Sequence, residues 1–196
     1  GSALIYRAYF AIPDNLTTAS GLHTNAIYGF ATMFRRLFSG RKPDLGAVVF
    51  DAPGPTFREQ RYPEYKANRP EMPKELREQL GYIDQLVEAH CFASMRLPGY
   101  EADDIIGTLT VKAVAEGMEV VIVSSDKDFA QLIGPHVRML DTLRNVTYDV
   151  DLVMKKWGVK PEQMIDFLAL RGDDSDNIPG VPGIGDKSAA ALLAKY

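Results

Sequence analysis

Apolar side chains recur at three- and four-residue intervals along residues 22–39, which predicts an amphipathic helix. Its apolar face would carry Ile27, Phe30 and Phe34, and Gly40 follows as a suitable C-terminal cap. Similar patterns predict helices over residues 76–87, 102–116, 151–157, 161–170 and 187–194. Beyond Asp149 the predicted elements are all helical.

Short apolar runs between these helices predict strands over residues 46–50, 92–97 and 119–123. Runs this apolar are typical of strands buried on both faces of a parallel sheet. Strands that alternate with helices imply right-handed crossovers and helices on both faces of the sheet. The sequence therefore predicts an α/β fold.

Eight carboxylates lie in four short clusters, each near the start or end of a predicted element. They are Asp51, then Glu101, Asp103 and Asp104, then Asp126 and Asp128, then Asp173 and Asp176. Asp51 and Asp126 directly follow predicted strands, and ligands of parallel sheets bind at the carboxyl ends of the strands. Mg²⁺ and Mn²⁺ take oxygen ligands, so the pattern indicates a divalent-metal site.

Structural roles for the same acids remain open at this point. Glu101 and Asp104 share one helical face, where acids also favour the helix dipole. Asp128 could cap a short helix that runs to Leu132, whereas Asp126 at the strand end has less structural reason to be acidic.

Residues 57–69 interleave Arg58, Arg61, Lys66 and Arg69 with aromatic side chains. Basic groups attract a phosphate backbone and aromatic rings stack on bases, so this segment is a candidate for single-strand binding. Tyr6 and Arg7, with their aromatic neighbours, form a smaller set of this type. A solvated charged loop is the alternative for residues 57–69.

The stretch 171–187 is rich in glycine beside an acidic cluster. Gly180, Gly183 and Gly185 permit close backbone approach, and the turn opens onto a helix whose first N–H groups can bind phosphate without recognising bases. A tight loop between two helices would explain the glycines but not the neighbouring acids.

Length and composition fit one domain with room for a small appended module: 196 residues, 46% of them hydrophobic. Cys91 is the single cysteine, which excludes an internal disulfide, and its ordinary role would be that of a small buried hydrophobe. With no membrane-length apolar run, we expect no membrane partner and a cytoplasmic location. The net charge of −4 does not exclude a nucleic-acid partner, because the chain without those eight acids is basic.

Six segments in order carry a likeness to a known family: residues 6–9, 48–51, 57–58 with 65–69, 99–104, 125–128 and 172–185. Together they resemble the 5′-nuclease (flap endonuclease) family, most closely the N-terminal 5′-to-3′ exonuclease domains of bacterial DNA polymerase I. The resemblance implies a PIN-like α/β core over residues 1–160, with an arch-like segment at about 53–73. It also implies the start of a helix-three-turn-helix module over residues 161–196.

The resemblance assigns a role to each candidate residue. All eight acids match metal-site carboxylates for two divalent cations, Mg²⁺ or Mn²⁺. Asp51, Glu101, Asp103 and Asp126 are expected nearest one ion, Asp128, Asp173 and Asp176 around the second, and Asp104 in either group. Lys66 and Arg69, with the metal-bound Asp126, form the expected catalytic set. The expected DNA contacts are Tyr6, Arg7, Arg58, Tyr65, Lys66, Arg69, Gly180, Gly183, Gly185 and Lys187, with a K⁺ ion at the turn 178–185.

The implied activity is structure-selective cleavage of DNA at a single-strand/double-strand junction or 5′ flap, which leaves 5′-phosphate and 3′-hydroxyl ends in primer removal and repair. Work at the bacterial nucleoid and a polymerase domain in the same polypeptide belong to the same expectation. Members of the family carry a strand that ends in Asp just before the segment matching Gly1–Ser2, so we expect that strand and ligand to be missing here.

Three alternatives remain open. A non-catalytic module could use the basic segment and the glycine turn to hold branched nucleic acid. A phosphoacceptor domain would explain the strand-end aspartates but not the glycine turn. A nuclease directed at RNA is also open, because no residue visibly tests a 2′-hydroxyl.

Overall fold

The computed structural model describes residues 1–40 and 42–196, which divide into two compact units. Unit 1 comprises residues 1–56 and 70–102, and unit 2 comprises residues 57–69 and 103–196. Among the described residues, no helix combines the length and apolarity that crossing a membrane requires.

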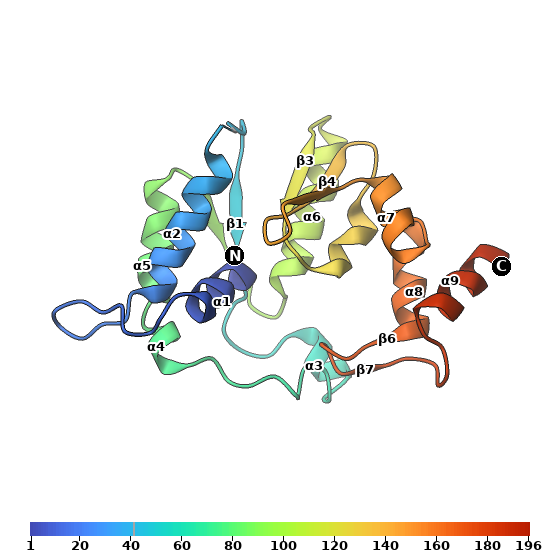
Figure 1. Ribbon diagram of the computed structural model, residues 1–196, viewed down its shortest axis with the longest axis horizontal. Coiled ribbons are helices and arrows are strands. Elements are labelled where there is room, and N and C mark those ends of the chain that lie inside the picture. Colours follow the sequence, from blue (N-terminus) through green and yellow to red (C-terminus); the bar gives the residue numbers. More distant parts are fainter. Residues whose placement is uncertain (41) are drawn as a thin grey trace. The chain divides into compact units, whose positions relative to one another are not determined.

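Unit 1 places three helices and a turn of helix around a pair of short strands (Figure 1). The elements are α1 (Ser2–Ala11), α2 (Asn25–Phe38), β1 (Ala47–Val49), α4 (Lys74–Arg77), α5 (Leu80–Ala89) and β2 (Ala93–Met95). β1 and β2 are parallel, and Val48 pairs with Ser94. Phe30, Phe34, Leu76 and Val87 lie in the shared core.

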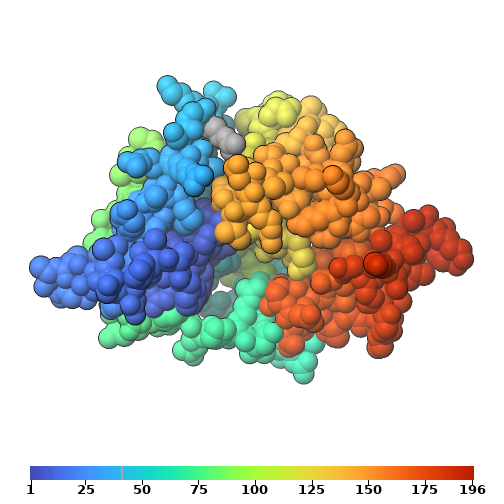
Figure 2. Space-filling view, in the orientation of Figure 1, coloured from blue at the N-terminus to red at the C-terminus, as the bar shows by residue number. Residues whose placement is uncertain are grey.

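Helices α1 and α2 pack closely because Gly29 lacks a side chain. A Cβ on Gly29 would lie 2.8 Å from the Cβ of Ala8, which is closer than real side chains approach. Between α1 and α2, residues 13–21 form an exposed loop that projects from unit 1 (Figure 2). Helix α1 was not predicted, although it carries Tyr6 and Arg7.

The single helix predicted over residues 76–87 is wrong in detail, because α4 ends at Arg77 and α5 begins at Leu80. Gln79, between them, is fully buried. Its Oε1 accepts hydrogen bonds from Ala26 N at 2.9 Å and Ile27 N at 3.2 Å. The interruption therefore supplies acceptors to the first amides of α2, which a helix leaves without partners.

Cys91 does not have the buried position expected for it. The residue is exposed and has a positive φ of 60°, in the turn between α5 and β2. The buried-hydrophobe interpretation of Cys91 is therefore wrong.

Unit 2 contains a three-stranded sheet followed by helices (Figure 1). Its elements are α3 (Phe57–Arg61), α6 (Ala102–Ala115, whose first residue falls in unit 1), β3 (Val120–Val123), η1 (Lys127–Leu132), β4 (Val137–Asp141), β5 (Val146–Tyr148), α7 (Val150–Trp157), η2 (Pro161–Gln163), α8 (Met164–Arg171), β6 (Gly172–Asp173), β7 (Ile178–Pro179) and α9 (Asp186–Lys195). β3 and β4 are parallel, but β5 is antiparallel to β4. The antiparallel strand departs from the parallel sheet that was predicted.

One core joins the sheet of unit 2 to its C-terminal helices. Ile122 of β3, Val153 of α7, Phe167 of α8 and Ala189 of α9 belong to the same buried cluster. The segments between these elements, which carry Asp126, Asp128, Asp173 and Asp176, are therefore held by a shared packed interior.

Candidate metal centre and DNA-binding surface

Unit 2 brings three of the predicted carboxylates together. Asp128 lies in η1, Asp173 ends β6 and Asp176 follows in the next turn. One oxygen from each lies within 4.8 Å of the others, and within residues 1–40 and 42–196 no other such group of three was found. We call these three residues the carboxylate cluster. Carboxylate oxygens at this spacing suit a hard divalent cation.

Asp126 and Asp128 have the reverse of their expected structural roles. Asp126, not Asp128, is the N-cap of η1, and its Oδ1 accepts a 3.0 Å hydrogen bond from Asp128 N. The sequence argument that Asp126 has less structural reason to be acidic is therefore wrong. The cap engages the Asp128 backbone, and the Asp128 side chain belongs to the cluster.

Asp128 is the member of the cluster whose chemistry most favours a cation. Burial, together with the negative charges of Asp126, Asp173 and Asp176, raises its pKa to about 6, although Lys127 opposes the shift. Its Oδ1 is buried and has no hydrogen-bond partner in the described part of the chain. Buried polar atoms normally have a partner, so a ligand role fits this oxygen.

Asp173 is held by groups on two sides. Lys127 Nζ donates to Oδ2 at 2.6 Å, while Ser175 N and Oγ donate to Oδ1 at 3.0 and 2.7 Å. Burial would raise the pKa of Asp173, but these contacts keep it below its usual value. Lys127 Nζ also lies 3.8 Å from Asp128 Oδ1 and so bridges two members of the cluster. Lys127 was not among the predicted site residues, because its contact with Asp173 joins positions 46 residues apart in the sequence.

Asp176 is bound by side chains of the arch-like segment predicted at about residues 53–73. Tyr65 donates its hydroxyl to Oδ2 at 3.0 Å, and Arg69 Nη2 donates to Oδ1 at 2.6 Å. Lys66 Nζ lies 3.8 Å from Oδ2. The structure thus brings three predicted DNA contacts onto one predicted metal ligand.

Backbone contacts fix the same segment, residues 62–69, against the loop 174–177. Lys66 N donates to Asp176 O at 3.0 Å, and Asn177 Nδ2 donates to Glu64 O at 2.7 Å. Asn68 Nδ2 and Arg69 Nε donate to the carbonyls of Asp174 and Ser175 at 3.1 and 3.3 Å. Lys66 and Asn177 both have a positive φ of 56°, an uncommon conformation outside glycine.

Arg58 and Asp104 form a two-pronged ion pair within unit 2. Both guanidinium nitrogens donate to the carboxylate at 2.7 Å. Asp103 and Asp104 lie in the first turn of α6, where acids also favour the helix dipole. The structure does not place Asp103 or Asp104 in the carboxylate cluster.

The remaining predicted acids belong to unit 1. Asp51 Oδ1 accepts a 2.9 Å hydrogen bond from Ala102 N and so caps the start of α6. Glu101, which precedes Ala102, is 9% exposed. Tyr6 and Arg7 of α1, predicted to contact DNA, are in the same unit.

The glycine turn is shaped by two different constraints. A Cβ on Gly180 would lie 2.2 Å from Arg171 O, so the approach of β7 to the end of α8 requires a glycine there. Gly183 has a φ of +81° with open space around its Cβ position. Gly185 is the N-cap of α9.

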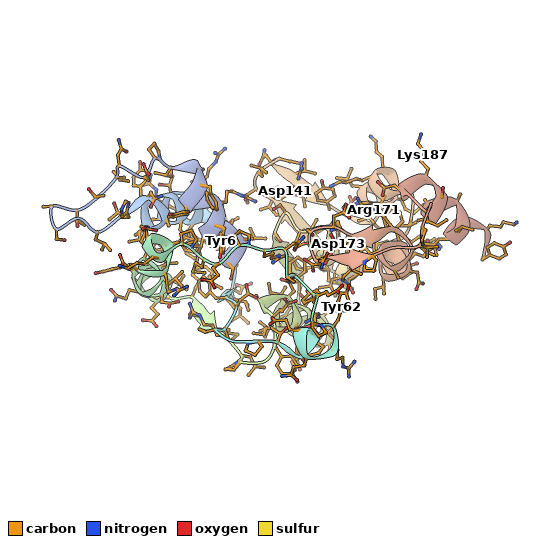
Figure 3. All side chains as sticks on the ribbon, turned by 90° about the horizontal axis from the view of Figure 1, so that it is seen from below. Tyr6, Tyr62, Asp141, Arg171, Asp173 and Lys187 are labelled. Atoms are coloured by element: carbon orange, nitrogen blue, oxygen red, sulfur yellow. The ribbon has the colours of Figure 1, made fainter. Side chains whose placement is uncertain are left out.

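Charged residues surround the start of α9. Asp186, in its first turn, forms an ion pair with Arg171 at the end of α8. Lys187 is exposed and projects away from the turn, while Asp173 lies just beyond Arg171 along the chain (Figure 3). A helix start with an exposed lysine in its first turn is suited to phosphate.

Comparison with known proteins gives matches along the whole chain. Residues 1–158 match the family model described as the 5′-3′ exonuclease N-terminal resolvase-like domain, and residues 159–196 match that of the 5′-3′ exonuclease C-terminal SAM fold. A 5′-3′ exonuclease of Aquifex aeolicus is 42% identical over 196 residues, covering 100% of this chain and 68% of the relative.

DNA polymerase I of Bacillus caldotenax is 44% identical over 200 residues, covering 100% of this chain but only 23% of the relative. The chain thus spans less than a quarter of the length of that polymerase. Among solved structures, the T5 5′-exonuclease with bound divalent metal ions (zinc) superposes with a TM-score of 0.78 at 26% identity. That match covers 100% of this chain and 73% of the T5 protein.

Proposed function

The chain belongs to the 5′-3′ exonuclease family, and on that premise we propose that it is a divalent-metal-dependent 5′ nuclease that cleaves DNA phosphodiesters. The observation that carries the proposal is the convergence of Asp128, Asp173 and Asp176 within 4.8 Å beside a basic segment. The products would carry 5′-phosphate and 3′-hydroxyl ends, and the preferred substrate would be a 5′ flap or a junction of single and double strands.

The metal ligands proposed in unit 2 are the carboxylate cluster with Asp126, Asp103 and Asp104, and those proposed in unit 1 are Asp51 and Glu101. Mg²⁺ or Mn²⁺ ions would supply an activated water and neutralise charge on the leaving oxygen. The buried Asp128 Oδ1, which has no hydrogen-bond partner among the described residues, and the all-oxygen donor set support this assignment.

Lys66 and Arg69 are proposed to hold the scissile phosphate, because positive charge fixed beside a developing negative charge lowers the barrier. Arg58 and Tyr65 would contact single-stranded DNA. Tyr6 and Arg7 would add DNA contacts from unit 1. No protein general base is needed in this scheme, since a bound cation lowers the pKa of water.

The turn Ile178–Gly185, with Lys187, is proposed to hold the duplex backbone. Backbone amides at a helix start bind phosphate irrespective of base sequence, which suits recognition of DNA structure. A K⁺ ion bound by carbonyls of this turn belongs to the proposal, and duplex affinity that is higher in KCl than in NaCl would support it.

Cleavage of a 5′-labelled flap substrate tests the function. The wild-type protein should release short products with Mg²⁺ and none with EDTA, and Asp128→Asn should be inactive but still bind the substrate. Binding by the wild type without any metal-dependent product would favour the non-catalytic alternative.

A DNA substrate implies work in the bacterial cytoplasm, where the nucleoid lies. The relatives named DNA polymerase I make a polymerase region in the same polypeptide the first partner to look for. The reading frame around this chain would test that expectation.

A further inference from the structure

The carboxylate cluster already has counter-ions within unit 2. Lys127 forms ion pairs with Asp173 and Asp128. Arg69 and Lys66 form ion pairs with Asp176. Three basic side chains therefore face the three carboxylates of the cluster. Asp126 adds a fourth negative charge beside Asp128. These four carboxylates and three basic side chains sum to one negative charge, which is less than the charge of a divalent cation.

Both oxygens of Asp176 are engaged. Oδ1 accepts a 2.6 Å hydrogen bond from Arg69 Nη2, and Oδ2 accepts a 3.0 Å hydrogen bond from the Tyr65 hydroxyl. Lys66 Nζ forms an ion pair with Oδ2 at 3.8 Å. A divalent cation bound to either oxygen would lie near these positive groups. A divalent cation carries twice the charge of a lysine or arginine side chain, so at this range it repels both basic groups and attracts the carboxylate more strongly than either does.

The contacts that would be lost are weak by comparison. The Arg69 side chain is 52% exposed, so solvent screens its ion pair with Asp176. A divalent cation is therefore a stronger partner for Asp176 than the partly exposed Arg69 side chain. The hydrogen bonds from Lys66 N to Asp176 O and from Asn177 Nδ2 to Glu64 O do not involve the Asp176 carboxylate, so they can hold the segment in place while its basic side chains leave.

We propose that Lys66 and Arg69 compete with a divalent cation for Asp176, so that cation binding releases both side chains from the cluster and makes them available to phosphate. The inference rests on the proposed metal site. Its consequence is that the basic side chains become available to DNA only after the cluster has taken up its ion.

Affinity for Mn²⁺, measured without DNA by electron paramagnetic resonance, tests the competition. Arg69→Ala should bind Mn²⁺ about 2- to 5-fold more tightly than the wild type, the range that a partly exposed ion pair allows. Arg144→Ala is the matched control, because Arg144 is another partly exposed arginine and it pairs at 2.9 Å with Asp141, a carboxylate that is not a member of the cluster. It should leave the affinity unchanged.

A double-mutant cycle locates the effect at Asp176. In an Asp176→Asn background, Arg69→Ala should no longer change the affinity. Unchanged or weaker Mn²⁺ binding by Arg69→Ala alone would overturn the competition while leaving the metal site standing. Equal Mn²⁺ binding by the wild type and Asp128→Asn would remove the metal site and this inference with it.

Lysine reactivity gives a readout independent of affinity. Lys66 should be acylated faster by an N-hydroxysuccinimide ester in Mg²⁺ than in EDTA, because its Nζ leaves Asp176. Lys74, whose side chain is 83% exposed, is the internal reference and should react equally in both. A Lys66 rate that does not respond to Mg²⁺ would contradict the release.

Discussion

Tyr65 and Asp176 are 111 residues apart in the sequence, yet the tyrosine hydroxyl donates a 3.0 Å hydrogen bond to Asp176 Oδ2. The hydrogen bond joins two segments that the sequence indicated separately. They are residues 57–69, with their basic and aromatic side chains, and residues 171–187, with their glycines and acids. Within unit 2 the two predicted features are therefore one structure. A substitution in either should affect both metal binding and DNA handling.

The pKa of Asp128 predicts a pH-dependent effect on stability. A folded-state value of about 6, above the value of 3.8 expected in the unfolded chain, means that the folded state binds more protons between pH 4 and 6. The stabilisation by the protonated carboxyl is lost as the pH rises through 6. In EDTA, Asp128→Asn should therefore raise the free energy of unfolding at pH 8 by about 1–2 kcal/mol, after allowance for partial exposure.

Urea denaturation at pH 5 and pH 8 measures this effect. At pH 5 the difference from the wild type should shrink, because Asp128 is then mostly protonated. The exposed Asp44→Asn gives a charge-matched control. An equal gain for Asp128→Asn at both pH values would rule out the proposed origin.

Asp126 combines a structural and a proposed chemical role that two substitutions separate. Asp126→Asn keeps an oxygen acceptor for Asp128 N, whereas Asp126→Ala removes it and should cost about 1 kcal/mol of stability. Both should abolish Mg²⁺-dependent cleavage. If Asp126→Asn retained activity, Asp126 would be only a helix cap.

Lys66→Ala should slow the chemical step about 100-fold, because it removes a positive charge proposed to stabilise the transition state. Single-turnover cleavage at saturating enzyme measures that step apart from binding. Lys66→Arg should recover part of the rate. An unchanged single-turnover rate in Lys66→Ala would show that Lys66 has no role in the chemical step.

Substitutions of Gly180 and Gly183, two glycines of the turn, should have different effects. Gly180→Ala forces a Cβ to 2.2 Å from Arg171 O and should lower the stability of the fold. Gly183→Val has open space but an unfavourable φ of +81°, so it should chiefly alter the turn and weaken duplex binding. Thermal melting and flap-duplex affinity, measured on both variants, separate the outcomes. Normal affinity for Gly183→Val would make the turn purely structural.

The α/β class was predictable because its strongest patterns are local. The periodicity behind α2 and the apolar runs behind β1 and β3 correspond to elements within a few residues of their predicted bounds. The resolvase-like and SAM-fold matches confirm the predicted fold class and family. The domain boundary at residue 160 stays a prediction.

Other elements depend on contacts that no local pattern reveals. Helix α1 buries only Ile5 and Ala8, so its aromatic side chains resembled a stacking surface rather than a helix. Strands β6 and β7 contain glycine, aspartate and proline, and they pair because Gly172 and Gly180 permit close approach. Strand propensity alone disfavours both.

The candidate site was likewise predictable where it depends on local sequence, and not where it depends on contacts between distant residues. The acid clusters and the glycine-rich stretch could be picked out from the sequence, but the sequence could not show which side chains neutralise which carboxylates. Lys127 was missed because its role depends on Asp173, which is 46 residues away. The individual roles of the site residues stay predictions until the variants are measured.

The exposed thiol of Cys91 has a practical consequence. As the only cysteine in the chain, it reacts with maleimide dyes or spin labels at one place, without prior removal of other thiols. The label would sit on unit 1, while every residue of the carboxylate cluster belongs to unit 2. With a second probe on unit 2, the label at Cys91 would allow the distance between the two units to be measured by spectroscopy in solution.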